Sequence, residues 1–444
     1  MTATRNQPRS FLDSKESSTE GVGRLPTRRN ARGDGKNAIR QDRVIAGGPE
    51  DFMEVRHLVL TGTNEEIGRA LATLAIERFG LKAQASTDRL RTRVQRRYIE
   101  MNYPILHDRM RGVAAAFGKR LDDDGWNFSG LDYLLGPPPG CSVVYYPPGV
   151  TADCKGVISR NYDYGTGTAL DEWPEPGELP ANSRPYLVEL HPDRGYASMA
   201  LYAFDLLSGV MDGINSAGLT VTVLVDDELE PDHPSDPTED SGVGLDECQI
   251  LRLLLDTCAS VEEAKEALLF TKQYYMFLPS HYLIADRHGE SFVWEYSHAH
   301  NREHIVESPG RPLISTNFRL HQYLDGENPP SAEQAKEVCG RYAVLAEGIA
   351  AERGKLTEDV IGTTHKAVDM VIPRAVYGGK TPIRTLWHAL YFPERRKVRV
   401  SFYLGEEPDP DETKEPRIRR SDYLEFVLAA PPEGQQARSG RDVR

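Results

Sequence analysis

A cysteine directly after a glycine is the first feature of this sequence that can do chemistry. Residues 137 to 140 read PPPG, and Cys141 follows at the start of an alternating run of valine and tyrosine. The thiolate is the nucleophilic form of cysteine, so catalysis by Cys141 needs a nearby base or a lowered pKa. No papain-type or caspase-type sequence surrounds any of the five cysteines, which argues against a histidine-activated thiol of those types.

Cleavage of the chain before Cys141 would create a base. If the bond between Gly140 and Cys141 is cut, the freed α-amine, with an ordinary pKa of about 8, can take the proton from its own side chain. Gly140 suits such a junction, because a residue without Cβ tolerates strained geometry at its own carbonyl. The three prolines would hold the preceding segment extended. A simpler interpretation stays open, in which Cys141 is a buried residue that begins a strand.

Charged residues end the next apolar strand, which reads GVISRNYDY. If this strand and the Cys141 strand pair as a hairpin, Arg160 and Asp163 lie beside the start of the Cys141 strand. Asp163 can then hold the α-ammonium or the thiol, and Arg160 can orient a substrate or balance the carboxylate. The two residues are also a common structural ion pair.

Elements of one type follow one another in runs along the chain. A short strand and a helix come first, with Thr63 and Glu66 as a capping box, and a second helical stretch covers about 86 to 119. From Cys141 the apolar period becomes two, which is typical of closely spaced antiparallel strands. A helical pair, a hairpin, another strand, a helix and a final strand pair follow. These runs predict an α+β layered architecture rather than a doubly wound parallel sheet.

Six segments, in order, resemble the N-terminal nucleophile (Ntn) cysteine hydrolases of linear amides. This family includes choloylglycine hydrolases, penicillin V acylases and, most similar here, the autoproteolytic branch typified by isopenicillin N acyltransferase. The segments are LVLTGTNEEIGRALA, GCS, GVISRNYDY, MDGINSAGLTVT, HYLIADRHGESFVWEY and LISTNF. Together they cover nearly the whole chain that we expect to be ordered.

The resemblance implies a four-layer αββα fold and a role for each matching residue. The implied roles are the nucleophile for Cys141, substrate and amine positioning for Arg160 and Asp163, an oxyanion donor for Asn317, a substrate contact for Tyr162, the active-site rim or a second oxyanion donor for Asn215, and a second functional arginine for Arg341. The sequence FRLHQYL after Asn317 departs from the family, in which many relatives have a histidine there. We therefore expect a different pocket wall at that point.

Composition excludes several classes of partner. The net charge of −14 at pH 7 opposes contact with phosphate backbones and anionic membranes, so nucleic acid is not expected. No apolar run is long enough for a membrane span, and the N-terminus lacks the apolar core of a secretory signal, so we expect a cytoplasmic protein.

The cysteines form no CxxC pair, which argues against a disulfide framework. His298, His300 and His304 lack a fourth metal ligand, and we expect no metal and no organic cofactor.

We therefore expect a precursor that is cut between Gly140 and Cys141 and that acts on a small-molecule linear amide. The acyl-thioester on Cys141 would pass to water in a hydrolase or to an acceptor amine in an acyltransferase, and the sequence leaves this choice open. The expected parts are a disordered basic tail (1–48), a helical leader (49–140), a catalytic core (141–406) and a partly disordered extension (407–444). The alternative is a catalytically silent relative that serves as a binding or scaffolding module, with Cys141 merely packed.

Overall fold

The computed structural model describes residues 38–129, 140–168, 172–226, 243–276, 279–297, 301–326, 328–336, 339–372, 380–407 and 416–430. All of them belong to one compact unit, Gly35–Arg444. The three prolines before Gly140, the first part of the expected tail and the end of the expected extension lie outside the described residues.

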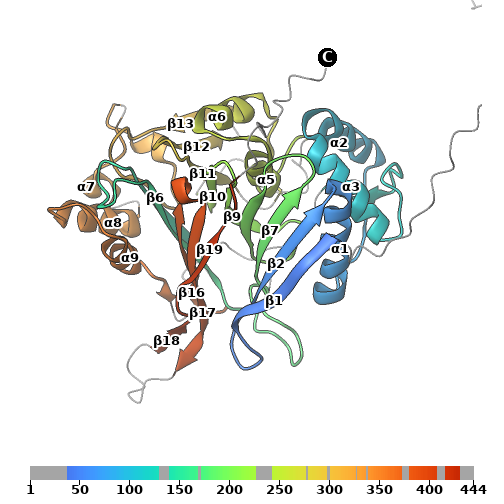
Figure 1. Cartoon of the computed structure of the whole chain (residues 1–444), viewed down its shortest axis with the longest axis horizontal. Helices are drawn as coiled ribbons and strands as arrows, with labels where there is room; N and C mark the ends of the chain where they lie inside the picture. Colours follow the sequence, from blue (N-terminus) through green and yellow to red (C-terminus); the bar gives the residue numbers. More distant parts are fainter. Residues whose placement is uncertain are drawn as a thin grey trace, which may run out of the picture. The chain divides into compact units, whose positions relative to one another are not determined.

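Two sheets stand at the centre of this unit (Figure 1). The first has nine strands in the order β1 (Ile39–Gly47), β2 (Glu54–Gly62), β7 (Tyr186–Pro192), β8 (Ser198–Tyr202), β9 (Val210–Asn215), β10 (Thr220–Val225), β11 (Ser280–Ala285), β12 (Ser291–Ser297) and β13 (Arg302–Val306). The second follows the order β14 (Leu313–Ser315), β5 (Gly140–Tyr146), β6 (Val157–Gly165), β16 (Ile383–Phe392), β17 (Lys397–Glu407) and β18 (Arg417–Arg420), with β15 (Val371–Ile372) on β16 and β19 (Leu424–Val427) on β17. A small separate pair joins β3 (Gln84–Ala85) to β4 (Trp126–Asn127).

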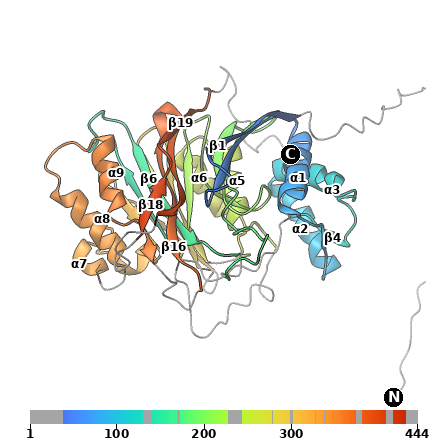
Figure 2. The ribbon, with the colours of Figure 1, turned by 90° about the horizontal axis from the view of Figure 1, so that it is seen from below.

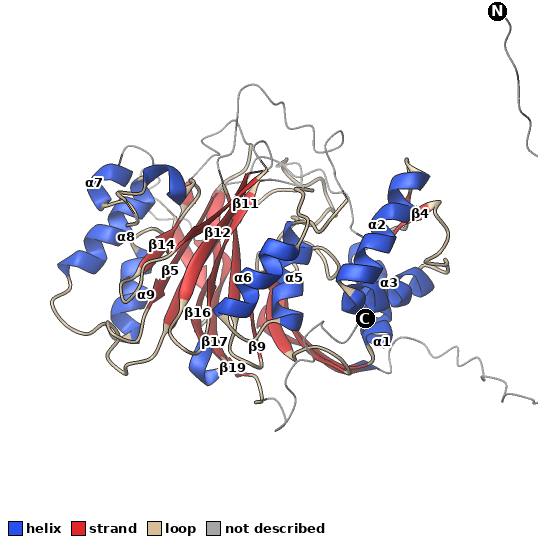
Figure 3. Ribbon diagram, turned by 90° about the horizontal axis from the view of Figure 1, so that it is seen from above, coloured by secondary structure: helices blue, strands red, loops and turns tan. Residues whose placement is uncertain are grey.

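Helices cover the outer face of each sheet, so the layers run helix, sheet, sheet, helix (Figures 2 and 3). The helices beside the nine-stranded sheet are α1 (Asn64–Phe79), α2 (Arg89–Asn102), α3 (Pro104–Ala116), α5 (Glu247–Thr257) and α6 (Val261–Phe270). Those beside the eight-stranded sheet are α7 (Ala332–Ala335), α8 (Gly340–Ala351) and α9 (Glu358–Lys366). Short 3₁₀ turns lie at Leu320–Tyr323 and Pro393–Arg395. The expected α+β, four-layer αββα fold is confirmed.

Period-two alternation divides the apolar residues between two cores. In β10, Leu224 joins the core between the two sheets, whereas Val221 and Val223 join the core under α1, α3 and α5. Successive side chains of a strand point to opposite faces. The nine-stranded sheet is therefore buried on both faces, and Cys141 belongs to the core between the sheets.

The expected boundaries of the tail, leader and extension need correction. Residues 39–47, placed in the disordered tail, form β1 and pair with β2, and β2 in turn pairs in parallel with β7. β1 therefore belongs with the leader, and the leader is not wholly helical, because β1 and β2 both extend the core sheet (Figure 1). β1 is a half-exposed edge strand, so its polar sequence lacks the apolar alternation of buried strands. In the extension, β18 and β19 pair with β17.

A buried carboxylate joins the leader helices to α5. Asp256 of α5 accepts hydrogen bonds from both terminal nitrogens of Arg109 in α3, at 2.6 and 3.1 Å. It also accepts from Arg252 and from the hydroxyl of Tyr103. Burial opposes ionisation of Asp256, but the two guanidinium groups lower its pKa overall. This cluster is a buried polar link across the apolar contact between the leader and the core.

Replacement of the shared carboxylate tests that link. In Asp256→Asn, two buried guanidinium groups lose their counter-charge, so we expect the free energy of unfolding to fall by about 3–5 kcal/mol. Denaturant titration followed by circular dichroism measures the change. The control Asp122→Asn removes an exposed partner of Arg120 and should leave the midpoint unchanged. An unchanged midpoint in Asp256→Asn would contradict the structural role of the cluster.

Candidate active site

The register of β5 and β6 determines which side chains surround Cys141. Gly140 pairs with Asp163 and Cys141 with Tyr162, and paired residues of neighbouring strands point to the same face. Cys141, Tyr162 and Arg160 therefore face the nine-stranded sheet. Asp163 faces the opposite layer, which contains α8 and α9. The sulfur and the carboxylate thus lie on opposite sides of one strand pair.

Arg160 places a buried positive charge beside the sulfur. Its side chain is fully buried, and Nη2 donates to the carbonyl of Val223 in β10 at 2.8 Å. Burial opposes the charge on Arg160, but Cys141, through charge and a hydrogen bond, and Asp212 together raise its pKa. A buried cation is thus held beside the sulfur of Cys141.

The buried partner of Arg160 is Asp212, a residue that the sequence analysis missed. Asp212 in β9 lies 3.6 Å from Nε of Arg160 and accepts from the indole of Trp387 at 3.3 Å and from the hydroxyl of Tyr391. Burial raises the pKa of Asp212, and Arg160 opposes that rise. The available signal was an aspartate inside the apolar run VMDGIN. The expected Arg160–Asp163 pair is not formed, because residues three apart in a strand point to opposite faces.

Two side chains from distant elements contact the backbone N–H and the carbonyl of Cys141. Asn317, just after β14, accepts a hydrogen bond from the backbone N–H of Cys141 through Oδ1 at 2.6 Å. Arg341 of α8 donates through Nη1 to the carbonyl of Cys141 at 2.9 Å and through Nη2 to Oδ1 of Asn317 at 2.7 Å. Nδ2 of Asn317 donates to the carbonyl of Val225 at 2.5 Å. Since Oδ1 meets only donors and Nδ2 meets an acceptor, the orientation of the amide is determined.

Asp163 lies opposite Gly140 in the same strand pair. It is buried, accepts from the hydroxyl of Thr385 at 2.6 Å, and lies 3.1 Å from Nη1 of Arg341. Burial raises the pKa of Asp163 to about 6, although Arg341 and Thr385 act to lower it. Asp163 therefore changes its charge within the range of pH in which many enzymes work.

The ends of two long side chains lie close to Gly140, and a larger residue would have to displace them. A Cβ at this position would lie 2.9 Å from Nη2 of Arg341 and 3.1 Å from the terminal methyl of Met370. The absence of a side chain thus lets the Arg341 guanidinium come close to the junction. Close approach of a neighbouring group is one of the constraints that favour glycine.

Tyr162 and Asn215 take structural positions. The Tyr162 ring stacks on Trp387 with ring centres 4.0 Å apart, and its hydroxyl donates to Asn182 at 3.2 Å. All four hydrogen bonds of the Asn215 side chain go elsewhere, two to backbone N–H groups of its own turn and two to carbonyls at the end of α5. The Asn215 amide thus fastens α5 to the turn after β9, and the substrate contact expected of this residue stays a prediction.

Two buried histidines lie behind the strand pair, on the face toward α9, and the sequence analysis did not single them out. His365 is 3.0 Å from the hydroxyl of Ser142, and His388 is 2.9 Å from that of Ser159. Burial lowers the pKa of His388 to about 3 and holds that of His365 well below its usual range. Both imidazoles are neutral, so they support the strands without adding charge.

No metal-binding group is evident within the described ranges, where no three histidine, cysteine, aspartate or glutamate side chains converge. His298 and His300 lie outside those ranges. Among the helices that the structure describes, none is both long and apolar enough to cross a membrane.

Comparison with known proteins identifies a family whose sequence pattern this chain matches. A model of the family "Acyl-coenzyme A:6-aminopenicillanic acid acyl-transferase" matches residues 150–407, a span that begins just after β5 and includes Arg160, Asp163, Asn317 and Arg341. No curated protein matches the chain. Among solved structures, a variant of conjugated bile acid hydrolase from Clostridium perfringens is 15% identical, with a TM-score of 0.40 over 65% of this chain and 97% of that one.

Penicillin V acylase from Agrobacterium tumefaciens is 17% identical, with a TM-score of 0.33 over 59% of this chain and 82% of that one. The family match extends over more than half of the 444 residues. The chain therefore belongs to the acyl-coenzyme A:6-aminopenicillanic acid acyl-transferase family, and it is an Ntn-type enzyme that hydrolyses linear amides or transfers their acyl groups.

Proposed function

We propose that this chain is a precursor that cuts itself between Gly140 and Cys141 and then uses Cys141 to hydrolyse a small linear amide or to transfer its acyl group. The observation that carries the proposal is the hydrogen bond from the Cys141 N–H to Asn317, with Arg341 on the next carbonyl. A strand that served only for packing would have no need of two polar side chains from distant elements on the backbone of one residue.

In the proposed cleavage, the sulfur of Cys141 attacks the carbonyl carbon of Gly140. The C–N bond breaks as the C–S bond forms, and the nitrogen gains a proton to become an amine. Asn317 already accepts a hydrogen bond from that nitrogen, so the developing amine keeps its partner through the step. Water then hydrolyses the thioester and leaves Gly140 as a carboxylate. Arg160 places a positive charge beside the attacking sulfur.

After cleavage, the same groups would serve turnover. The free amine of Cys141 takes the thiol proton, and Asp163 and Asn317 hold the resulting ammonium in place. The thiolate attacks the substrate carbonyl, and the negative charge on that oxygen needs donors. Nδ2 of Asn317 has a second hydrogen beyond the one bound to Val225, and loss of one such donor costs about 10²–10³ in rate. The acyl group then passes from sulfur to water or to an amine.

The acyl group on Cys141 can pass either to water or to an amine. The family description names an acyl-coenzyme A donor and an amine acceptor, 6-aminopenicillanic acid, which supports acyl transfer beside hydrolysis. A panel of N-acyl amino acids, acyl-coenzyme A thioesters and β-lactam amides, each with and without a free amine, separates the two. Release of free acid alone identifies a hydrolase, and formation of a new amide identifies a transferase.

Substitution of the nucleophile tests both steps. We expect Cys141→Ala to remain a single 444-residue chain and to lose turnover, because both reactions need the sulfur. Intact-mass spectrometry and a product assay measure this, with Cys154→Ser, at an exposed cysteine, as the control that still cleaves. An uncut wild-type chain with full activity would refute the processing step. An uncut and inactive wild-type chain would instead favour the scaffolding alternative.

The pKa of Asp163 predicts a second step in the pH profile. Turnover needs one proton lost from the amine–thiol pair and, in this proposal, an ionised Asp163. As the pH falls through about 6, Asp163 gains a proton and stops holding the ammonium. The slope of log kcat/KM against pH should therefore steepen from about one to about two below pH 6. In Asp163→Asn the break should vanish, and in Arg341→Met it should move to higher pH, since Arg341 lowers the pKa of Asp163.

The leader should stay with the core after cleavage. It contributes β1 and β2 to the core sheet and Arg109 to the Asp256 cluster, and none of these contacts depends on the Gly140–Cys141 bond. We expect two bands on a denaturing gel but a single peak in size-exclusion chromatography under native conditions. Two native peaks, one holding the leader alone, would contradict this.

A further inference from the structure

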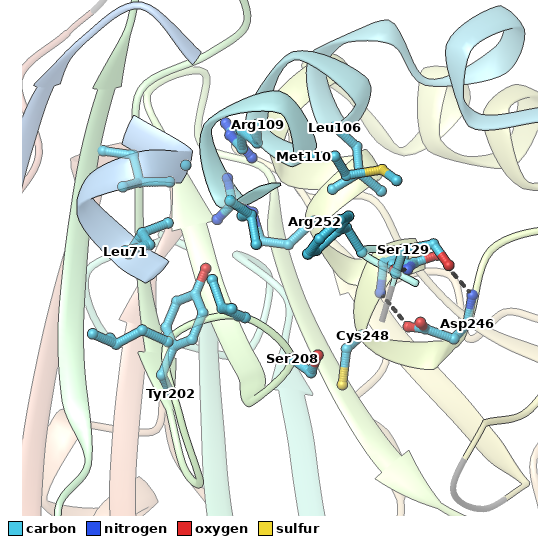
Figure 4. A pocket seen from close by; sticks show the side chains of 17 residues that line it. Leu71, Leu106, Arg109, Met110, Ser129, Tyr202, Ser208, Asp246, Cys248 and Arg252 are labelled. Atoms are coloured by element: carbon cyan, nitrogen blue, oxygen red, sulfur yellow. Dashed lines mark hydrogen bonds between the residues drawn. The ribbon is translucent and has the colours of Figure 1, made fainter. Parts of the chain in front are cut away.

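A pocket of about 70 Å³ lies between the leader and the core, on the face of the nine-stranded sheet away from Cys141 (Figure 4). The lining side chains come from α1, α3, α5 and the sheet itself. Most are apolar, among them Leu71, Met110, Val113, Phe128, Leu190 and Leu206. The pocket is thus built from both parts of the chain that the proposed cleavage would separate.

Three charged side chains, Arg109, Asp246 and Arg252, interrupt this apolar lining. Arg252 of α5 is only 7% exposed, and Figure 4 shows it among the side chains that line the pocket. Its Nη2 donates to Asp256 and, at 3.1 Å, to the hydroxyl of Ser198. Its Nε and Nη1 are buried and have no hydrogen-bond partner in the part of the chain that the structure describes. Buried guanidinium N–H groups without an acceptor are costly.

The surrounding charges leave Arg252 short of acceptors. Arg109 uses both terminal nitrogens on Asp256 and donates through Nε to Asn64 at 3.0 Å. Asp256 therefore receives hydrogen bonds from Arg109, Tyr103 and Arg252 together. Asp246 also lines the pocket, but its carboxylate caps α5 by accepting from the N–H of Gln249 at 2.8 Å. Two guanidinium groups thus share one carboxylate.

We propose that this pocket binds a short-chain monocarboxylate. One oxygen of the carboxylate would accept from Nη1 of Arg252, since a guanidinium and a carboxylate form charge-assisted hydrogen bonds. The alkyl chain would lie among the leucines and Val113. A cavity of this size holds only a few water molecules, so it suits a chain of only a few carbons.

The site is independent of the chemistry proposed for Cys141. Cys141 belongs to the core between the two sheets, whereas the pocket lies in the core under the leader helices. A ligand that contacts both α3 and α5 strengthens the association of leader and core. Binding is therefore expected to stabilise the folded chain, whether or not the chain is cut, by mass action.

Calorimetric titration of the purified protein tests the proposal. Sodium acetate, propionate, butyrate and octanoate are compared at matched ionic strength, with 1-butanol as the neutral analogue. We expect one site per chain, affinity that rises by about fourfold for each CH₂ from acetate to butyrate, and a drop for octanoate, which is too long. Butyrate should bind at least about tenfold more tightly than 1-butanol because of the charged contact. Absence of saturable butyrate binding would overturn the proposal and leave water as the occupant.

Two substitutions locate the site by different means. Arg252→Lys keeps a cation for Asp256 but loses the planar set of donors, so butyrate binding should weaken by about tenfold. Val113→Phe fills the pocket without a change in charge and should abolish binding. Arg111→Lys, at an exposed arginine of the same leader helix α3, is the matched control and should bind as the unmodified chain does. Unchanged affinity in folded Val113→Phe would overturn the assignment even if Arg252→Lys proves unstable.

Discussion

The antiparallel pairing of β5 and β6 is the constraint on which the site depends. Because Gly140 pairs with Asp163 and Cys141 with Tyr162, one face of the pair presents the sulfur to Arg160 and the other presents the Asp163 carboxylate. The Gly140–Cys141 bond lies at the edge between these two environments. A shift of one residue in register would move every side chain to the other face and would separate the sulfur from Arg160. The neighbouring strands β14 and β16 pair on either side of β5 and β6 and hold this register.

Two ion pairs lie on opposite faces of the β5–β6 strand pair. Arg160 and Asp212 lie between the sheets, where Arg160 places a positive charge beside the sulfur. Arg341 and Asp163 lie on the face toward α8, where Arg341 donates to the carbonyl of Cys141. Burial makes both pairs sensitive to loss of either partner. Neutral His365 and His388 behind the strands add hydrogen bonds there without disturbing this balance of charge.

The leader is part of the fold and shares its cores. β2 lies between β1 and β7 (Figure 1), and α1 and α3 cover the outer core of the same sheet. At the closest approach of these two helices, a Cβ on Gly68 would lie 2.1 Å from the carbonyl oxygen of Arg109, so glycine is needed for that contact. Such packing explains why the Arg252 pocket, with residues from both parts, exists only in the assembled chain.

Local patterns allowed part of this structure to be predicted. The change of apolar period at Cys141 predicted β5, the Thr63–Glu66 capping box predicted the start of α1, and six ordered segments predicted the family. The sequence by itself thus determined the strand that carries Cys141, the α+β class and the residue types of the site. Only the tertiary structure decided that Arg160 pairs with Asp212, that Arg341 reaches Cys141, that Asn215 serves α5 and that Arg252 enters a pocket. These contacts join residues far apart in the chain, and the packing of sheets and helices, rather than any local periodicity, brings them together.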